Sequence, residues 1–139
     1  NAFRYAKWEA AFAKRELDDP VLTITFELSN PQENVLCLKV SNTGKPVDAA
    51  ILQALHTLFG KDRYTREFRE AAQSLRAPSS RGRWPTGLEH ERSGFGLEKF
   101  ASYLWGLWGK QPPSSGVVGE VTSNESMTCF AFFLPMIIP

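Results

Sequence analysis

The chain begins with NAFRYA, which places an amide, a guanidinium and a phenol at helical spacing. Asn1, Arg4 and Tyr5 stand at positions i, i+3 and i+4, so a helix would project them from one face. An amide oxygen can ligate Mg²⁺, and a guanidinium can neutralise phosphate charge. The stretch therefore fits a metal-bound polyphosphate, with Asn1 as the metal ligand. An ordinary solvated helix face is the simpler interpretation of this stretch alone.

A second stretch, VSNTGKPVD, follows an apolar run that is typical of a strand. Gly44 allows the backbone to turn tightly, and Asn42 then presents an amide at the end of the strand. A planar heterocycle such as adenine could hydrogen-bond to that amide. The alternative is a plain turn between a strand and a helix.

A third stretch, SGFGL, comes directly before a helical pattern. Glycines at positions 94 and 96 let backbone N–H groups face an anion near a helix N-terminus, whose dipole favours negative charge. A Gly-x-Gly pair also begins many helices that bind nothing, so this stretch by itself does not decide between the two interpretations.

Helices and strands must bring these stretches together. The alternation of Leu22, Ile24, Phe26 and Leu28 predicts a half-buried strand, the turn SNPQEN predicts a hairpin, and Asp48 can cap a helix. The predicted elements are a helix in 1–17, strands in 22–28 and 35–41, a helix in 48–59, a polar insertion in 60–92, a helix after Gly96, and strands in 116–123 and 127–135.

The order of these elements resembles the ATP-binding domain of sensor histidine kinases and their relatives, the Bergerat fold. The resemblance covers nearly the whole chain and implies one α/β (α+β) sandwich in residues 1–139, with a mixed, mainly antiparallel sheet and helices on one face. It also implies that residues 60–92 form a lid over ATP and Mg²⁺. The nucleotide-binding residues carried over by the resemblance are Asn1, Arg4, Tyr5, Asn42, Gly44, Arg92, Ser93, Gly94, Phe95, Gly96 and Leu97.

Three positions depart from the family pattern. Asn42 replaces the usual aspartate, Pro46 replaces a glycine, and Arg92 replaces the first glycine of the later loop. A neutral acceptor at position 42 should hold adenine less firmly than a carboxylate. The carboxylate that polarises the acceptor in relatives would precede Asn1, so no catalytic residue is predicted within the chain.

The resemblance implies a histidine kinase catalytic domain that positions Mg²⁺·ATP for phosphoryl transfer to a histidine elsewhere. His56 and His90 lack the setting of an acceptor histidine; we expect His56 to be a helix-face residue and His90 to be solvated. The implied partners are a histidine-containing dimerisation domain and a response regulator. ERSGFG is also similar to anti-sigma-factor serine kinases, whose partner is an anti-anti-sigma protein. A degenerate, non-catalytic nucleotide-sensing or interaction domain is the third alternative.

Composition excludes other classes. A net charge of +1 argues against nucleic-acid binding, although Trp84 lies near Arg81 and Arg83. No apolar run is long enough for a membrane span, so a cytoplasmic location is expected, and the chain's start at Asn1 suggests that an upstream part of the domain is missing.

Cysteines and tryptophans are expected to have structural roles. Cys37 and Cys129 lie in apolar runs and are expected to be buried thiols, and neither the cysteines nor the histidines show the spacing of zinc ligands. Trp105 and Trp108 are expected in the core, and an exposed pair would instead indicate a partner surface.

Four arginines of the insertion recur at mostly helical intervals: Arg63, Arg66, Arg69 and Arg76. They form either a solvated helix face or a group that closes onto the triphosphate.

Overall fold

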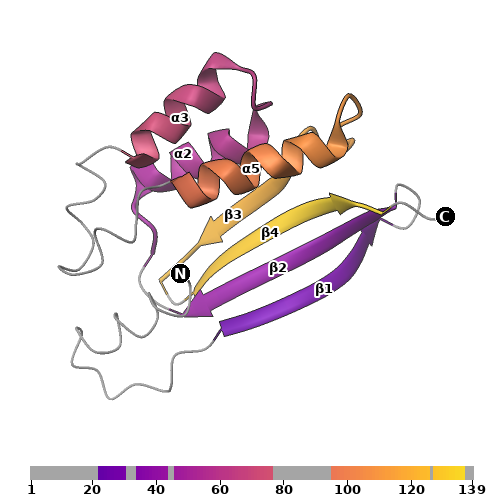
Figure 1. The fold of residues 1–139 in the computed structure, drawn as a ribbon. Coiled ribbons are helices and arrows are strands. Elements are labelled where there is room, and N and C mark those ends of the chain that lie inside the picture. The colour runs from indigo at the N-terminus through magenta and orange to yellow at the C-terminus, as the bar shows by residue number, and fades with distance from the viewer. Residues whose placement is uncertain (1–21, 31–33, 44–45, 77–94, 126, 137–139) are drawn as a thin grey trace.

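A computed structural model describes residues 22–30, 34–43, 46–76, 95–125 and 127–136. These residues form an α+β fold in which three helices cover one face of a four-stranded antiparallel sheet (Figure 1). The strands are β1 (Leu22–Asn30), β2 (Val35–Thr43), β3 (Gly119–Ser123) and β4 (Met127–Pro135), and the helices are α2 (Ala49–Gly60), α3 (Arg66–Arg76) and α5 (Phe95–Trp108).

The two sheet hairpins form where the sequence predicts them. Strands β1 and β2 pair through Phe26 and Leu38, and the turn between them includes Asn34, which adopts a left-handed φ of 54° that asparagine tolerates. The later hairpin pairs β3 with β4. Strand β4 also pairs with β2, so the sheet order is β1-β2-β4-β3. All described pairs are antiparallel, and the parallel component of the predicted mixed sheet does not occur among these strands.

The core lies between the sheet and the helices. Phe132 on β4 is its centre: its ring makes an edge-to-face contact with Phe100 of α5, with centroids 4.7 Å apart, and lies 5.5 Å from the ring of Phe59 of α2. The buried apolar residues of the helical layer include Leu55, Leu58, Phe68, Ala72, Ala101 and Leu104. Helix α2 begins as predicted at Asp48, whose carboxylate accepts a hydrogen bond from the backbone N–H of Ala50.

The tryptophans belong to this core, as predicted. Trp105 is buried and its indole N–H donates to the backbone oxygen of Leu58, while the half-buried Trp108 donates to the backbone oxygen of Phe133. These bonds fix α5 to α2 on one side and to the sheet on the other. His56 is an exposed helix-face residue, as predicted, and its ring Nε2 lies 2.8 Å from the backbone oxygen of Val121.

The first strand differs from the prediction of a half-buried element. Ile24, Phe26 and Leu28 lie on the same side of the sheet as the core residues of β2, because their register partners there are Val40, Leu38 and Leu36. All three are nevertheless exposed. In Figure 1, α2, α3 and α5 lie over the other strands, and β1 lies at the far edge of the sheet. The predicted helix in residues 1–17 lies outside the described residues.

Candidate functional site

Two polar side chains are buried within the described part of the chain, and they are neighbours. Asn42 is 4% exposed and Thr128 is 3% exposed, and the two residues are register partners across β2 and β4. Both lie on the helix-facing side of the sheet, in line with core residues such as Val40 and Phe130. A buried polar group costs free energy unless it is hydrogen-bonded. Two such groups side by side make this end of the sheet the candidate functional site.

A short hydrogen-bonded chain holds the threonine. The Thr128 hydroxyl lies 2.8 Å from the Ser123 hydroxyl of β3, and Ser123 Oγ accepts a 2.8 Å hydrogen bond from the backbone N–H of Val47. The amide nitrogen of Asn42 donates to the backbone oxygen of Thr43 at 3.0 Å. That bond uses one of the two N–H groups of the amide, and the side-chain carbonyl oxygen is the atom that can accept from a donor such as an amino group.

Helix α5 begins at the same end of the molecule. In Figure 1, the ends of β2 and β3, the start of β4 and the first turns of α2 and α5 all lie at the left. Leu97 is half-buried and contacts the core, whereas a Cβ placed on Gly96 would meet no atom within 4 Å. Gly96 also has no left-handed φ. Neither the backbone nor packing among these residues therefore requires glycine at position 96.

Of the insertion arginines that the structure describes, Arg76 is the one with a contact to this end. Its Nη2 lies 3.3 Å from Oε2 of Glu98 in the first turn of α5, and both side chains are about 70% shielded from solvent. Arg66 instead pairs with Glu70 along α3, and Arg63 donates to the backbone oxygen of Ser102. The helical spacing of these arginines is confirmed over residues 66–76, which form α3 and bury Phe68, Ala71 and Ala72.

The structure describes four of the predicted nucleotide-binding residues. Asn42, Phe95, Gly96 and Leu97 all belong to the end of the molecule that carries the buried polar pair. The other seven predicted residues lie outside the described residues: Asn1, Arg4, Tyr5, Gly44, Arg92, Ser93 and Gly94. The later part of the predicted lid, residues 77–92, including His90, lies outside them as well.

Sequence reasoning missed Thr128 and Ser123. The available signal was a polar residue near the start of MTCFAFFLP, an otherwise apolar strand. This polar residue becomes informative only when the register is known, because the register makes Thr128 the partner of Asn42. That register follows from the position of β4 between β2 and β3.

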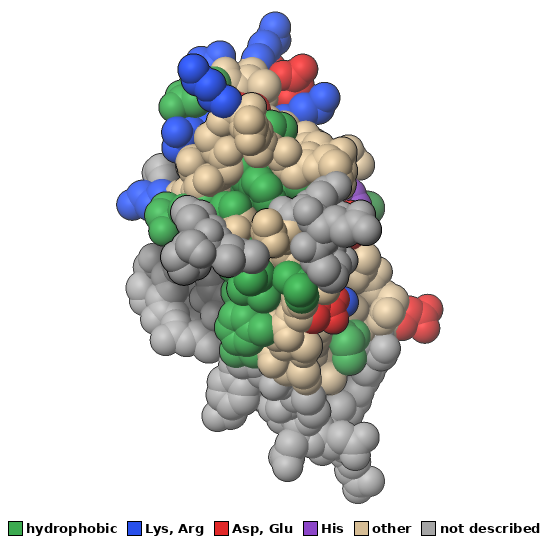
Figure 2. All heavy atoms as spheres, turned by 90° about the vertical axis from the view of Figure 1, so that its right-hand side faces the viewer, with side chains coloured by type: hydrophobic (Ala, Val, Ile, Leu, Met, Phe, Trp, Pro, Cys, Tyr) green, Lys and Arg blue, Asp and Glu red, His purple; other side chains and the backbone are tan. Residues whose placement is uncertain are grey.

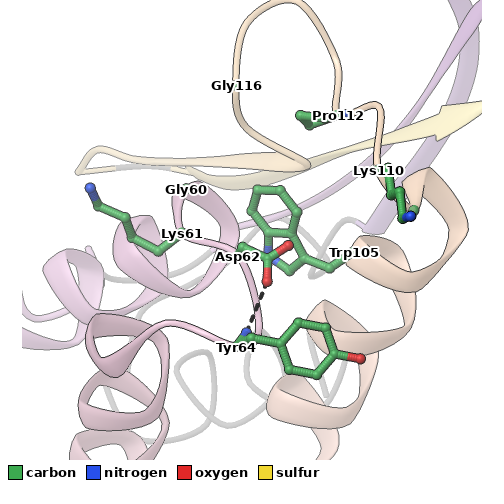
Figure 3. A pocket seen from close by; sticks show the side chains of 9 residues that line it. Gly60, Lys61, Asp62, Tyr64, Trp105, Lys110, Pro112 and Gly116 are labelled. Carbon is green, nitrogen blue, oxygen red and sulfur yellow. Dashed lines mark hydrogen bonds between the residues drawn. The ribbon is translucent and has the colours of Figure 1, made fainter.

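The described pocket of about 530 Å³ lies elsewhere, where α2 and α5 end. Figure 3 shows Trp105 and Asp62 near its centre, with Lys61 and Lys110 on opposite sides. Asp62 is engaged locally, because its carboxylate accepts a hydrogen bond from the backbone N–H of Tyr64. The pocket contains none of the predicted nucleotide-binding residues.

Metal-ligating and thiol groups are sparse. The described residues contain no group of three or more His, Cys, Asp or Glu side chains that could hold a metal ion. Cys37 and Cys129 are free thiols, and burial raises the pKa of the Cys37 thiol above its ordinary value. Within the described helices, none has the length and hydropathy needed to cross a bilayer.

Comparison with known proteins identifies no relative. No protein-family model, curated protein or solved structure matches this chain.

Proposed function

We propose that this chain is the ATP-binding domain of a histidine kinase of the Bergerat type, which positions Mg²⁺·ATP for phosphoryl transfer to a histidine outside the chain. The observation that supports this most is the pairing of Asn42 with Thr128, the two buried polar side chains among the described residues, at the end where α5 begins. An otherwise apolar layer that keeps hydrogen-bonding groups at this point suits a flat ligand with a polar edge.

The adenine base would lie against the buried polar pair. The carbonyl oxygen of Asn42 would accept a hydrogen bond from the adenine amino group, and the Thr128 hydroxyl offers a second polar contact beside it. Guanine carries an oxygen where adenine carries the amino group, so the same carbonyl would oppose guanine. The pair therefore favours ATP over GTP.

The phosphates would lie toward the first turn of α5. Free backbone N–H groups and the positive end of a helix dipole attract anions there. The open space at Gly96 leaves room for a phosphate to approach the backbone. Arg76 is close enough, through its contact with Glu98, to exchange that carboxylate for a phosphate oxygen and offset negative charge during transfer.

The Mg²⁺ ion would need oxygen ligands of its own. Its predicted ligand, Asn1, lies outside the described residues, and the buried polar side chains of Asn42 and Thr128 are neutral, which suits a base edge better than Mg²⁺. We therefore assign no described residue to the metal. When bound, Mg²⁺ would supply charge neutralisation between the phosphates.

Calorimetric titration with Mg²⁺·ATP tests the proposal. Asn42→Ala should weaken ATP binding about 5- to 30-fold, because one hydrogen bond to the base is worth about 1–2 kcal/mol. Ser41→Ala is the matched control, because Ser41 lies on the same strand and faces the other side of the sheet. Absence of heat and of any thermal shift at millimolar Mg²⁺·ATP would reject the proposal.

Gly96→Ala tests the phosphate end independently. The free energy of unfolding should stay unchanged or rise by up to about 1 kcal/mol, because the new Cβ meets no atom and alanine favours a helix. ATP affinity should fall while adenosine affinity stays constant, since adenosine has no phosphates. Equal loss for both ligands would contradict the placement of phosphate at α5.

The same purified protein distinguishes the histidine-kinase function from the two alternative functions. ATP binding with phosphoryl transfer to a serine of an anti-anti-sigma-type protein would identify the serine-kinase function. ATP binding without transfer to any acceptor would identify a nucleotide-sensing domain, which the neutral Asn42 favours because it is a weaker acceptor than a carboxylate.

A further inference from the structure

Two groups of large apolar side chains are exposed among the described residues. One is the row Ile24, Phe26 and Leu28 on β1, and nothing in the structure shows what covers it. The other consists of Tyr64 before α3 and of Tyr103 and Leu107 on α5, which are 78%, 62% and 42% exposed. We call this second group the tyrosine patch. Exposed apolar groups of this kind commonly mark protein contacts.

Arg63 holds the parts of the tyrosine patch together. Its guanidinium donates to the backbone oxygen of Ser102 at 3.2 Å and lies 4.8 Å from the ring centroid of Tyr64. Gly106 makes this possible, because a Cβ there would come within 3.0 Å of Arg63 Nη1. The loop before α3 is therefore fixed against α5, and Tyr64 is held beside the part of α5 that contains Ser102 and Gly106, which Tyr103 and Leu107 follow directly in the sequence.

Aromatic side chains that are already held in place lose little conformational entropy when they bind a partner. A tyrosine offers a large contact area and a polar tip, and it loses little conformational entropy because it has few rotatable bonds. The contact with Arg63 reduces that loss further for Tyr64. The tyrosine patch thus has the features of a preorganised docking surface rather than of an incidental apolar spot.

The charges beside the tyrosine patch are mainly positive. Tyr64 also lines the pocket at the ends of α2 and α5, where Lys61 and Lys110 lie on opposite sides (Figure 3). Neither lysine forms an ion pair with a described acidic residue. Figure 2, which faces this end of the molecule, shows Lys and Arg side chains gathered around the helical layer.

Part of the positive charge of these two lysines stabilises helix ends. Lys61 and Lys110 follow the last residues of α2 and α5, so they offset the partial negative charge at two helix C-termini. Each helix end carries only about half an elementary charge, whereas each ammonium carries one, so an excess of positive charge remains. Asp62 is the one acidic residue among the described residues that line the pocket, and its carboxylate accepts a hydrogen bond from the Tyr64 backbone N–H.

We propose that the tyrosine patch and the adjoining pocket form a docking surface for an acidic segment of a partner protein. A large apolar side chain of that segment would pack on Tyr64, Tyr103 and Leu107. Its carboxylates would pair with Lys61 and Lys110 on either side of the pocket. This surface is at the opposite end of α2 and α5 from Asn42, and the inference does not depend on nucleotide binding.

A random peptide display library provides the test. The library is selected on the wild-type chain, with counter-selection on a Tyr64→Ser/Tyr103→Ser/Leu107→Ser variant, and enriched peptides are measured by fluorescence anisotropy. Enriched peptides should carry a net negative charge and at least one large apolar residue. Lys61→Glu combined with Lys110→Glu should weaken their binding at least 10-fold, and higher salt should weaken it further.

Controls separate docking from damage to the fold. Met127→Ser changes an exposed apolar residue at the other end of the sheet and should leave peptide affinity unchanged. All variants should keep the wild-type circular dichroism spectrum, although Lys61→Glu/Lys110→Glu should lower the thermal midpoint because it places negative charge at two helix C-termini. Gly106→Ala displaces Arg63 and should weaken peptide binding without removing any patch side chain.

Three outcomes would overturn the inference. Enriched peptides without an acidic bias would remove the role of the lysines, and peptides that bind the serine variant equally well would remove the role of the tyrosine patch. Failure to enrich any peptide, together with a concentration-dependent dimer that the serine variant abolishes, would assign this face to a second copy of the chain instead.

Discussion

Asn42→Asp is the substitution that distinguishes an adenine acceptor from a structural amide. The change keeps the shape of the side chain and replaces its donating NH₂ group with an oxygen. That NH₂ now donates to the backbone oxygen of Thr43 at 3.0 Å, so the substitution sets two acceptors against each other in a site that is 4% exposed. An unsatisfied buried polar group costs about 1–3 kcal/mol, and more when it is charged.

The stability cost should depend on pH. Burial raises the pKa of the introduced carboxyl in the folded state above its unfolded value of about 3.9. A folded state that holds the proton more tightly is favoured at low pH. The destabilisation should therefore be small below about pH 4 and should develop as the pH rises from the unfolded pKa toward the folded pKa.

Nucleotide affinity should change in the opposite direction. A charged acceptor makes a hydrogen bond roughly twice as strong as a neutral one, a gain of about 1 kcal/mol, so Mg²⁺·ATP should bind about 5-fold more tightly at neutral pH. Urea unfolding with and without ATP measures the stability of the free protein and of the complex in one experiment, and calorimetry gives the affinity directly. A protein that stays folded but binds ATP no more tightly than wild type would refute the assignment of Asn42 as the adenine acceptor.

Two further predictions concern stability. Gly119→Ala should lower the free energy of unfolding by about 1–3 kcal/mol, because a Cβ there would lie 3.0 Å from the backbone oxygen of Ala131 and 3.2 Å from the Phe59 ring, in a core with no room to move; urea denaturation measures this, and an unchanged midpoint would contradict it. Stability should also fall as the pH rises above about 8.5, the unfolded pKa of a thiol, because burial raises the folded pKa of Cys37; Cys37→Ala should remove that part of the pH dependence, and an unchanged slope would exclude the thiol as its source.

Local patterns in the sequence predict most of the fold. Strict alternation identifies the first strand, because side chains on a strand change face at every residue. Asp48 identifies the start of a helix, because its carboxylate can accept from a free N–H in the first turn. The helical spacing that begins at Leu97 likewise predicts the core face of α5. Each signal depends on neighbours within a few residues.

The candidate site depends on contacts that are distant in the sequence. Thr128 meets Asn42 only because β4 inserts between β2 and β3, and no local pattern records that pairing. The same limit applies to the insertion arginines. Helical spacing predicts α3, yet the direction in which α3 crosses the other helices decides that Arg76, rather than Arg63, reaches the first turn of α5.

Helix α5 connects the two proposed sites and keeps them apart. Its 14 residues span about 20 Å, with Gly96 in the first turn and Leu107 in the last. Indole hydrogen bonds from Trp105 and Trp108 fix the helix to α2 and to the sheet, so it is held as a rigid spacer. Binding at one end should then leave the other end unchanged: Tyr103→Ser should weaken peptide docking at wild-type ATP affinity, and Asn42→Ala should weaken ATP binding at wild-type peptide affinity. Coupled losses in both variants would show that α5 moves as ligands bind, and the two sites would then have to be treated as one system.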